Sequence, residues 1–243
     1  MRIDQELVKR GLCESRTEAQ ELIAEGYVTV SGSIVKKQTK QVTDVDTLVV
    51  SARRRFVSRG GEKLLGVLRD VFGSDEVIHE KLHNKQALDI GSSTGGFTDC
   101  LLQYGVNHVH AVDVGTSQLH QKLRDSSKVS LFENTDIRNF KTTTSYDIVV
   151  ADVSFISLSV VVTTILSYGV SGTKFLLLVK PQFEVGKGNT KKGIVKDESL
   201  VKKLLTVYQE SLFNLGLNDV AVYPCRITGG DGNQEYFLYG VLE

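Results

Sequence analysis

Four charged residues, far apart in the chain, have the types and positions that acid–base chemistry needs. Asp152 and Lys180 each end an apolar run typical of a buried strand, and Glu235 begins the last such run. Lys63 lies in the amphipathic helix expected ahead of the first run. In open α/β sheets, ligands bind beyond the carboxyl ends of the strands, where lysines and carboxylates can hold or move a substrate proton. These four residues are therefore candidates for one polar site at the ends of the strands.

The elements that must position this site alternate between strand and helix after residue 56. Apolar runs predict strands over 87–90, 108–113, 129–132, 146–152, 174–180, 217–223 and 235–242. Helical patterns occupy 64–71, the segment beginning at 97, 119–123 and 199–215. This alternation predicts an α/β fold with a Rossmann-like, mostly parallel sheet of about seven strands, which ends in a pair of consecutive strands.

A glycine turn follows the first of these strands, in the stretch 86–99. Gly91, Gly95 and Gly96 separate the strand from a helix that begins at Phe97. Glycine adopts positive φ without strain and has no Cβ, so the backbone can approach a ligand closely beneath a helix N-terminus. The spacing differs from the Gly-x-Gly-x-x-Gly pattern of dinucleotide sites. The alternative is that the glycines only form a tight turn.

An acid ends the next strand and strengthens the ligand-binding interpretation. Asp113 has the spacing of a carboxylate that binds ribose hydroxyls. The stretch 86–99 resembles the first motif of S-adenosylmethionine-dependent methyltransferases, which implies S-adenosylmethionine as cofactor. Asp136, after the third strand, then suits the adenine amine, although it fits a helix cap equally well. The resemblance places eight residues at the cofactor: Asp89, Gly91, Ser92, Gly95, Gly96, Phe97, Asp113 and Asp136.

The four charged residues resemble the Lys-Asp-Lys-Glu tetrad of the RrmJ/FtsJ class of ribose 2′-O-methyltransferases. The flanking residues match too: Ser58-Arg59-x-x-x-Lys63, Ala151-Asp152, Val179-Lys180 and Glu235-Tyr236. A ribose hydroxyl is a poor nucleophile until its proton is removed or its oxygen is held by a positive charge. The resemblance implies that Lys180 does this and that Asp152 orients both partners. Lys63 and Glu235 would fix the geometry, and no metal is expected.

The first 55 residues form a separate small unit in this interpretation. Two helical patterns come first, the second opened by a capping box of Ser15 and Glu18, and a hairpin over 26–35 follows. This order resembles the α-L RNA-binding motif and implies an α+β RNA-binding domain over 1–55, with a methyltransferase domain over 56–243. The resemblance implies phosphate contacts from Arg10, Arg16, Lys36 and Lys37. Each could equally be a plain surface base.

Charge is distributed unevenly although the chain has 29 basic and 29 acidic residues. Residues 1–63 contain 12 Lys and Arg against 9 Asp and Glu, a net charge of +3, so the remainder carries −3. A basic cluster spans 53–63, and within it we expect Arg54, Arg55 and Arg59 to contact RNA. The alternative is a solvated basic linker.

The combination of both parts resembles the TlyA/haemolysin A family over nearly the whole chain. The stretches 152–158, 179–184 and 186–188 read as that family does. The resemblance implies methylation of cytidine ribose in ribosomal RNA, with ribosomal RNA or ribosomal subunits as partners. Three scattered cysteines, no secretory leader and no apolar run of membrane-spanning length favour a cytoplasmic protein without a membrane partner.

Three other functions stay open at this point. A membrane-active protein, as the haemolysin name suggests, would need a broad apolar helix face, which these strand-length runs do not provide. An RNA-binding or ribosome-assembly factor with an inert methyltransferase domain would not need the tetrad. Base methylation is the runner-up, but the segment Asp152 to Phe155 lacks the prolines that such enzymes carry there. The modified nucleotide and the oligomeric state are not assigned.

Overall fold

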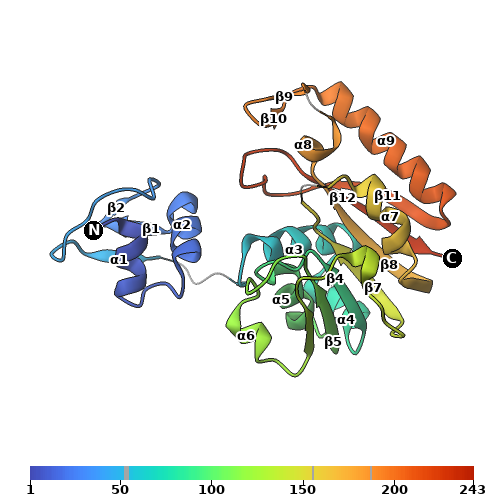
Figure 1. Ribbon diagram of the computed structural model, residues 1–243, viewed down its shortest axis with the longest axis horizontal. Helices are drawn as coiled ribbons and strands as arrows, with labels where there is room; N and C mark the ends of the chain where they lie inside the picture. Colours follow the sequence, from blue (N-terminus) through green and yellow to red (C-terminus); the bar gives the residue numbers. More distant parts are fainter. Residues whose placement is uncertain (52–54, 155, 187) are drawn as a thin grey trace. The chain divides into compact units, whose positions relative to one another are not determined.

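The computed structural model describes residues 1–51, 55–154, 156–186 and 188–243, and the chain divides into two compact units (Figure 1). The first unit spans Met1–Arg55 and the second Phe56–Glu243.

The first unit packs two helices against a small antiparallel sheet. Its helices are α1 (Ile3–Lys9) and α2 (Arg16–Glu25), and its strands, in the order β2-β1-β3, are β1 (Val28–Val30), β2 (Ser33–Ile34) and β3 (Leu48–Val50). The Ser15 hydroxyl accepts a hydrogen bond from the Glu18 amide at 3.1 Å, which starts α2 as expected. The Glu18 carboxylate accepts from the Glu14 amide instead of completing the box at Ser15.

The second unit is built on a seven-stranded sheet in the order β11-β12-β8-β7-β4-β5-β6. Its strands are β4 (Gln86–Ile90), β5 (His108–Val112), β6 (Val129–Phe132), β7 (Tyr146–Ala151), β8 (Gly169–Val179), β11 (Leu217–Pro224) and β12 (Tyr236–Leu242). Strands β4 to β8 run parallel, whereas β12 pairs antiparallel with both β8 and β11. The predicted fold class is therefore confirmed.

Helices cover both faces of this sheet (Figure 1). On one face lie α3 (Arg59–Phe72), α4 (Asp75–Leu82) and α5 (Gly96–Gln103), and on the other α7 (Leu158–Leu166) and α9 (Glu198–Asn214). Side chains alternate along each strand, so Ala87 packs under the first layer and Leu88 under the second. Burial on both faces explains why these strands read as continuous apolar runs.

Short elements connect these layers. They are α6 (Gln121–Arg124), the 3₁₀ helix η1 (Ile137–Asn139), α8 (Pro181–Glu184), β9 (Thr190–Lys191) and β10 (Ile194–Val195). Helix α8 begins directly after Lys180, with Pro181 at its first position, where the missing amide proton costs nothing. Strands β9 and β10 pair as a separate two-stranded hairpin.

Candidate active site

The sheet brings all four members of the predicted tetrad to one edge of the second unit. Asp152 directly follows β7 and Lys180 directly follows β8. Strand β12 runs antiparallel to β8 and pairs Tyr236 with Val179, so Glu235 lies beside the end of β8. Lys63 reaches the same edge from α3, because its ammonium forms an ion pair with Glu235.

The tetrad consists of two ion pairs. Lys63 and Glu235 form a buried pair, with side chains only 10% and 3% exposed. The Lys180 ammonium pairs with the carboxylate of Asp152 and also donates a hydrogen bond of 2.7 Å to the Ser154 hydroxyl. A buried charge without a partner is strongly unfavourable, so each pair fixes the position of its lysine.

A buried thiol lies within reach of both pairs. Cys225 is 7% exposed, and its amide donates to the Glu235 carbonyl at 2.8 Å. Burial, and after it the carboxylates of Glu235 and Asp152, raise the pKa of this thiol to about 12, while the two lysines act in the opposite sense. All four tetrad charges therefore act on the thiol of Cys225. No feature of the sequence pointed to Cys225, because its proximity depends on the pairing of β11 with β12.

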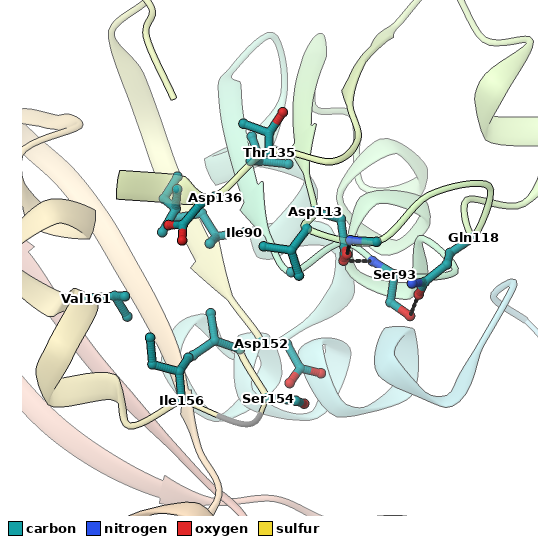
Figure 2. A pocket seen from close by; sticks show the side chains of 16 residues that line it. Ile90, Ser93, Asp113, Gln118, Thr135, Asp136, Asp152, Ser154, Ile156 and Val161 are labelled. Carbon is teal, nitrogen blue, oxygen red and sulfur yellow. Dashed lines mark hydrogen bonds between the residues drawn. The ribbon is translucent and has the colours of Figure 1, made fainter. Parts of the chain in front are cut away.

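A cavity of about 480 Å³ opens beside the Lys180–Asp152 pair (Figure 2). Its volume falls within the range of about 300 to 1,000 Å³ typical of small-molecule sites. The lining residues come from the ends of β4 and β5, from the segments that follow β4, β5, β6 and β7, and from η1 and α7: Ile90, Gly91, Ser93, Val112, Asp113, Val114, Gly115, Gln118, Thr135, Asp136, Ile137, Asp152, Val153, Ser154, Ile156 and Val161. Three of the predicted cofactor residues are among them.

Two carboxylates in this wall are held in place by local hydrogen bonds. Asp113 accepts from the amides of Ser93 at 2.8 Å and Gly115 at 2.6 Å, and the Ser93 hydroxyl donates to Gln118 (Figure 2). Asp136 accepts from the amide of Arg138 and forms an ion pair with its guanidinium, which lowers the pKa of Asp136 to about 2. Asp136 therefore both caps η1 and lines the cavity.

Gly91 is the turn glycine that contributes to the cavity wall. Its φ is +78°, and a Cβ there would overlap the carbonyl oxygen of Asp152. The absence of a side chain thus allows the ends of β4 and β7 to approach each other.

Other predicted cofactor residues lie outside the cavity wall. A Cβ on Gly95 would meet the side chains of Leu119 and Leu123, and Gly96 packs closely against Ser58 and the backbone of α3. Phe97 is buried and packs against Phe237, with ring centroids 5.8 Å apart. In the structure these three residues pack the turn against protein, because the helix after the turn faces α3 and α6.

Two more predicted residues, Asp89 and Ser92, are buried beneath the turn. One Asp89 oxygen accepts from the amide and hydroxyl of Thr98, at 2.9 and 2.6 Å. Burial, opposed by these bonds and assisted by the charge of Asp152, raises the pKa of Asp89 to about 7. Within the described residues, the second Asp89 oxygen and the Ser92 hydroxyl lack hydrogen-bond partners.

The polar and apolar residues that line the cavity fit S-adenosylmethionine. Asp113 and Asp136 can accept hydrogen bonds from hydroxyl and amine groups, and Val112, Ile137 and Ile156 give apolar walls for a planar ring. Buried polar atoms are normally satisfied, so the free oxygens of Asp89 and Ser92 are consistent with a polar ligand or water at the turn.

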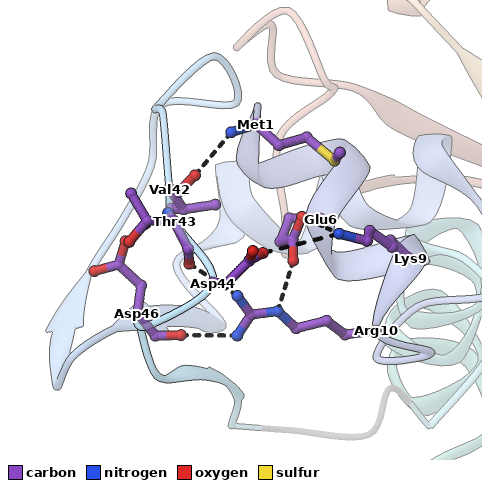
Figure 3. Close-up of polar contacts among 8 residues, drawn as sticks. All are labelled: Met1, Glu6, Lys9, Arg10, Val42, Thr43, Asp44 and Asp46. Atoms are coloured by element: carbon purple, nitrogen blue, oxygen red, sulfur yellow. Dashed lines mark hydrogen bonds and ion pairs between the residues drawn. The ribbon is translucent and has the colours of Figure 1, made fainter.

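The basic side chains predicted to contact RNA from the first unit differ in their exposure and in their contacts within the unit. Arg10 donates to Glu6 and to the carbonyls of Thr43 and Asp46, so it holds its own unit together (Figure 3). The contact of Arg10 with Glu6 follows from the i, i+4 spacing on α1, and the expected phosphate contact of Arg10 stays a prediction.

Arg16 instead belongs to a charge cluster around the fully buried Asp4. Against the desolvation of burial, hydrogen bonds from Gln20, Arg16 and Arg2 hold the pKa of Asp4 well below its usual range. Arg16 nevertheless remains 49% exposed. Lys36 and Lys37 are exposed as expected.

The basic cluster is only partly described. Arg55 is exposed, whereas Arg54 lies outside the described residues. In the second unit, the Arg59 guanidinium donates to the Thr228 carbonyl, which ties the start of α3 to the loop that leads to Glu235.

The described residues lack two kinds of feature. No group of three or more His, Cys, Asp or Glu side chains there could hold a metal ion. In that same part of the chain, no helix combines the length and apolar character needed to cross a membrane.

The fold and site together define a methyltransferase of the S-adenosylmethionine-dependent class. The FtsJ-like methyltransferase family matches residues 56–241, and the S4 domain family matches residues 1–48. The chain is 39% identical to the 16S/23S rRNA (cytidine-2′-O)-methyltransferase TlyA of Mycobacterium tuberculosis, over 98% of this chain and 88% of that protein. It is 35% identical to Hemolysin A of Brachyspira hyodysenteriae, over the full length of both.

Solved structures agree with this assignment. A hemolysin-named protein from Streptococcus thermophilus is 33% identical and superimposes with a TM-score of 0.76, covering 100% of this chain and 89% of that one. The chain therefore belongs to the TlyA family of FtsJ-like methyltransferases. The predictions of family, enzyme class and methyl-donor cofactor are confirmed.

Proposed function

We propose that this enzyme transfers a methyl group from S-adenosylmethionine to the ribose 2′-hydroxyl of cytidine in ribosomal RNA. The name of the Mycobacterium tuberculosis relative supports this substrate. One structural observation carries the chemical part of the proposal. The Lys180 ammonium contacts both Asp152 and Ser154, and these two residues line the cavity that fits the methyl donor.

The contacts of Lys180 suit the activation of a hydroxyl. The Lys180 ammonium lies at the rim of the cavity. There its positive charge could stabilise the oxygen of a bound hydroxyl group, or the lysine could exchange a proton with that group. Asp152 and Ser154 restrict where the ammonium can point, and positioning of this kind supplies much of the rate in group transfer. When bound, S-adenosylmethionine supplies a methyl group activated by the sulfonium.

The Lys63–Glu235 ion pair supports the arrangement around Lys180. Lys63 and Glu235 are almost fully buried, so their charges act through a medium of low polarity. We assign them the role of fixing the field and the geometry around Lys180, since Glu235 neighbours the end of β8.

In this proposal, the cofactor is held mainly by cavity residues that follow β4, β5 and β6. We assign Asp113 to the ribose hydroxyls and Asp136 to the adenine amine, and Gly91 lets the backbone approach the ligand closely. Asp89, Ser92, Gly95, Gly96 and Phe97 shape and support the turn.

The S4 domain would bring RNA to this site. Arg16, Lys36 and Lys37 are exposed bases of that unit, and contacts of such bases with phosphates position a protein without reading sequence. Arg55 and Arg59 are further basic residues in the sequence between this unit and α3, and we assign them RNA contacts as well. The substrate would be ribosomal RNA or a ribosomal subunit, which places the enzyme in the cytoplasm.

Mapping the position of the transferred methyl group tests the proposal. Ribosomal RNA is incubated with the protein and S-adenosylmethionine labelled in the methyl group, then digested to nucleosides. We expect 2′-O-methylcytidine, which the Lys180→Ala variant does not produce. Label on a base would favour base methylation instead. No transfer to RNA or subunits would support an RNA-binding factor without enzymatic activity and overturn the proposal.

A further inference from the structure

The segment between β7 and α7 is bridged twice to the chain that follows β8. The first bridge is the tetrad pair, in which Lys180 contacts Asp152 and Ser154 at the start of the segment. The second bridge begins four residues after Lys180, at the end of α8, and reaches the other end of the segment. Its central residue is Glu184, a half-buried carboxylate outside the tetrad.

Glu184 caps helix α7 from another element. Its Oε1 accepts a hydrogen bond of 2.9 Å from the Leu158 amide, and its Oε2 accepts one of 2.6 Å from the Ser157 hydroxyl. The first amides of a helix lack partners inside the helix, and a carboxylate there also complements the helix dipole. The carboxylate thus fixes the point at which the segment enters α7.

Helix α9 locks the same carboxylate. The Tyr208 hydroxyl donates to Glu184 Oε2 at 2.6 Å and accepts from the Ser159 amide at 3.1 Å. Burial, and then the neighbouring carboxylate, raise the pKa of Tyr208 to about 12, so this phenol keeps its proton at neutral pH. A hydrogen bond to a charged carboxylate is about twice as strong as one between neutral groups.

We infer that Glu184, locked by Tyr208, is a positioning residue that holds the β7–α7 segment so that Asp152 and Ser154 meet the Lys180 ammonium. This inference rests on the proposed function of Lys180. Residues 180–184 thus contact the segment on both sides, at Asp152 and Ser154 and at Ser157 and Leu158. Without Glu184, the Leu158 amide and the Ser157 hydroxyl lose this acceptor.

The test compares methyl-transfer rates of full-length variants at saturating RNA and S-adenosylmethionine. Glu184→Ala is expected to lower kcat by about 10- to 100-fold, because a misplacement of about 1 Å at the reacting groups costs about that much. Glu184→Gln keeps an acceptor for the Leu158 amide and should retain more activity. Tyr208→Phe removes the hydroxyl that donates to Glu184 and accepts from the Ser159 amide but leaves the carboxylate in place, so it should show the smallest loss. The matched control is Glu210→Gln, which alters an exposed acid of α9 and should leave kcat unchanged.

Two further readouts separate positioning from simple stabilisation. Thermal unfolding shows whether each variant is folded at the assay temperature. A double variant with Ser154→Ala should lose less than the product of the single losses, since Glu184 acts through the segment that carries Ser154. The inference is overturned if folded Glu184→Ala or Tyr208→Phe keeps the wild-type kcat, or if the losses with Ser154→Ala multiply.

The assay separates this inference from the proposed function. Transfer of labelled methyl groups is counted whatever atom receives them, so the ratio of variant to wild-type rate tests Glu184. The position of the label in digested RNA tests the ribose proposal.

Discussion

Neutralising both members of the buried Lys63–Glu235 pair should restore the stability that single variants lose, but it should not restore methyl transfer. Lys63→Met removes the ammonium and leaves a carboxylate that is 3% exposed without its partner. Glu235→Gln leaves the buried ammonium instead. The double variant Lys63→Met/Glu235→Gln removes both charges and keeps side chains of similar length.

The expected energies follow from burial. Removing one member of a buried pair costs about 3 to 5 kcal/mol, whereas replacing both by uncharged groups is often nearly neutral. We therefore expect each single variant to lose about 3 kcal/mol of unfolding free energy. The double variant should lose only about 1 kcal/mol, so the coupling energy, which is the difference between this value and the loss of about 6 kcal/mol from the two single variants together, should be about 5 kcal/mol. This exceeds the range of about 0.5 to 3 kcal/mol usual for residues in contact, because each single variant leaves a buried charge unpaired. Methyl transfer should stay low in all three, because the charges themselves act on the site.

Urea denaturation, followed by a probe in the second unit, measures these free energies, and labelled methyl transfer measures activity. Arg226→Gln with Asp70→Asn is a suitable control cycle, because that pair is largely exposed, at 54% and 27%, and exposed pairs contribute only about 0 to 1 kcal/mol. Additive losses in the Lys63–Glu235 cycle, or a double variant with wild-type activity, would refute the reasoning.

Three further predictions concern the cofactor turn and the thiol. Burial raises the pKa of Asp89 to about 7 in the folded chain, against 3.8 when unfolded. Its contribution to the free energy of unfolding is therefore complete below pH 3.8 and is lost as the pH rises through 7. Asp89→Asn should flatten this part of the stability profile, and an unchanged slope between pH 4 and 7 would contradict the assignment. Gly91→Ala should abolish binding of S-adenosylmethionine and destabilise the fold by more than the strain of about 1 to 3 kcal/mol expected for Gly172→Ala, where a Cβ meets nothing within 4 Å. Isothermal titration and denaturation test this, and equal effects at both glycines would refute it. Cys225 should resist iodoacetamide at pH 8 in the folded protein and react after unfolding, and rapid native labelling located by mass spectrometry would disprove its burial among the tetrad charges.

The sheet could be predicted because its parallel strands are buried on both faces and appear as separate apolar runs. Helix α7 was not predicted, although its buried residues recur at helical spacing, because its many β-branched residues favour a strand. Its helical form depends on caps from Ser157 and from the distant Glu184. The early start of β8 at Gly169 was also missed, because the exposed residues 170–172 resemble a loop.

The tetrad could be predicted because each member lies at the end or start of a strand or on the helix before the sheet. Ser154 and Cys225 were missed, because their contacts with the tetrad arise from a loop path and from the pairing of edge strands. The contact of Arg10 with Glu6 was also missed, although the spacing of four residues on one helix favours it.

The most direct test of the account is single-turnover methyl transfer by Lys180→Met, with binding of S-adenosylmethionine measured on the same preparation. General acid–base groups contribute about 10²- to 10⁴-fold, so we predict a loss of rate in that range while the cofactor still binds as in the wild type. A Lys180→Met enzyme that methylates ribosomal RNA within a few-fold of the wild-type rate would contradict the central claim that this ammonium, held by Asp152 and Ser154, activates the ribose hydroxyl.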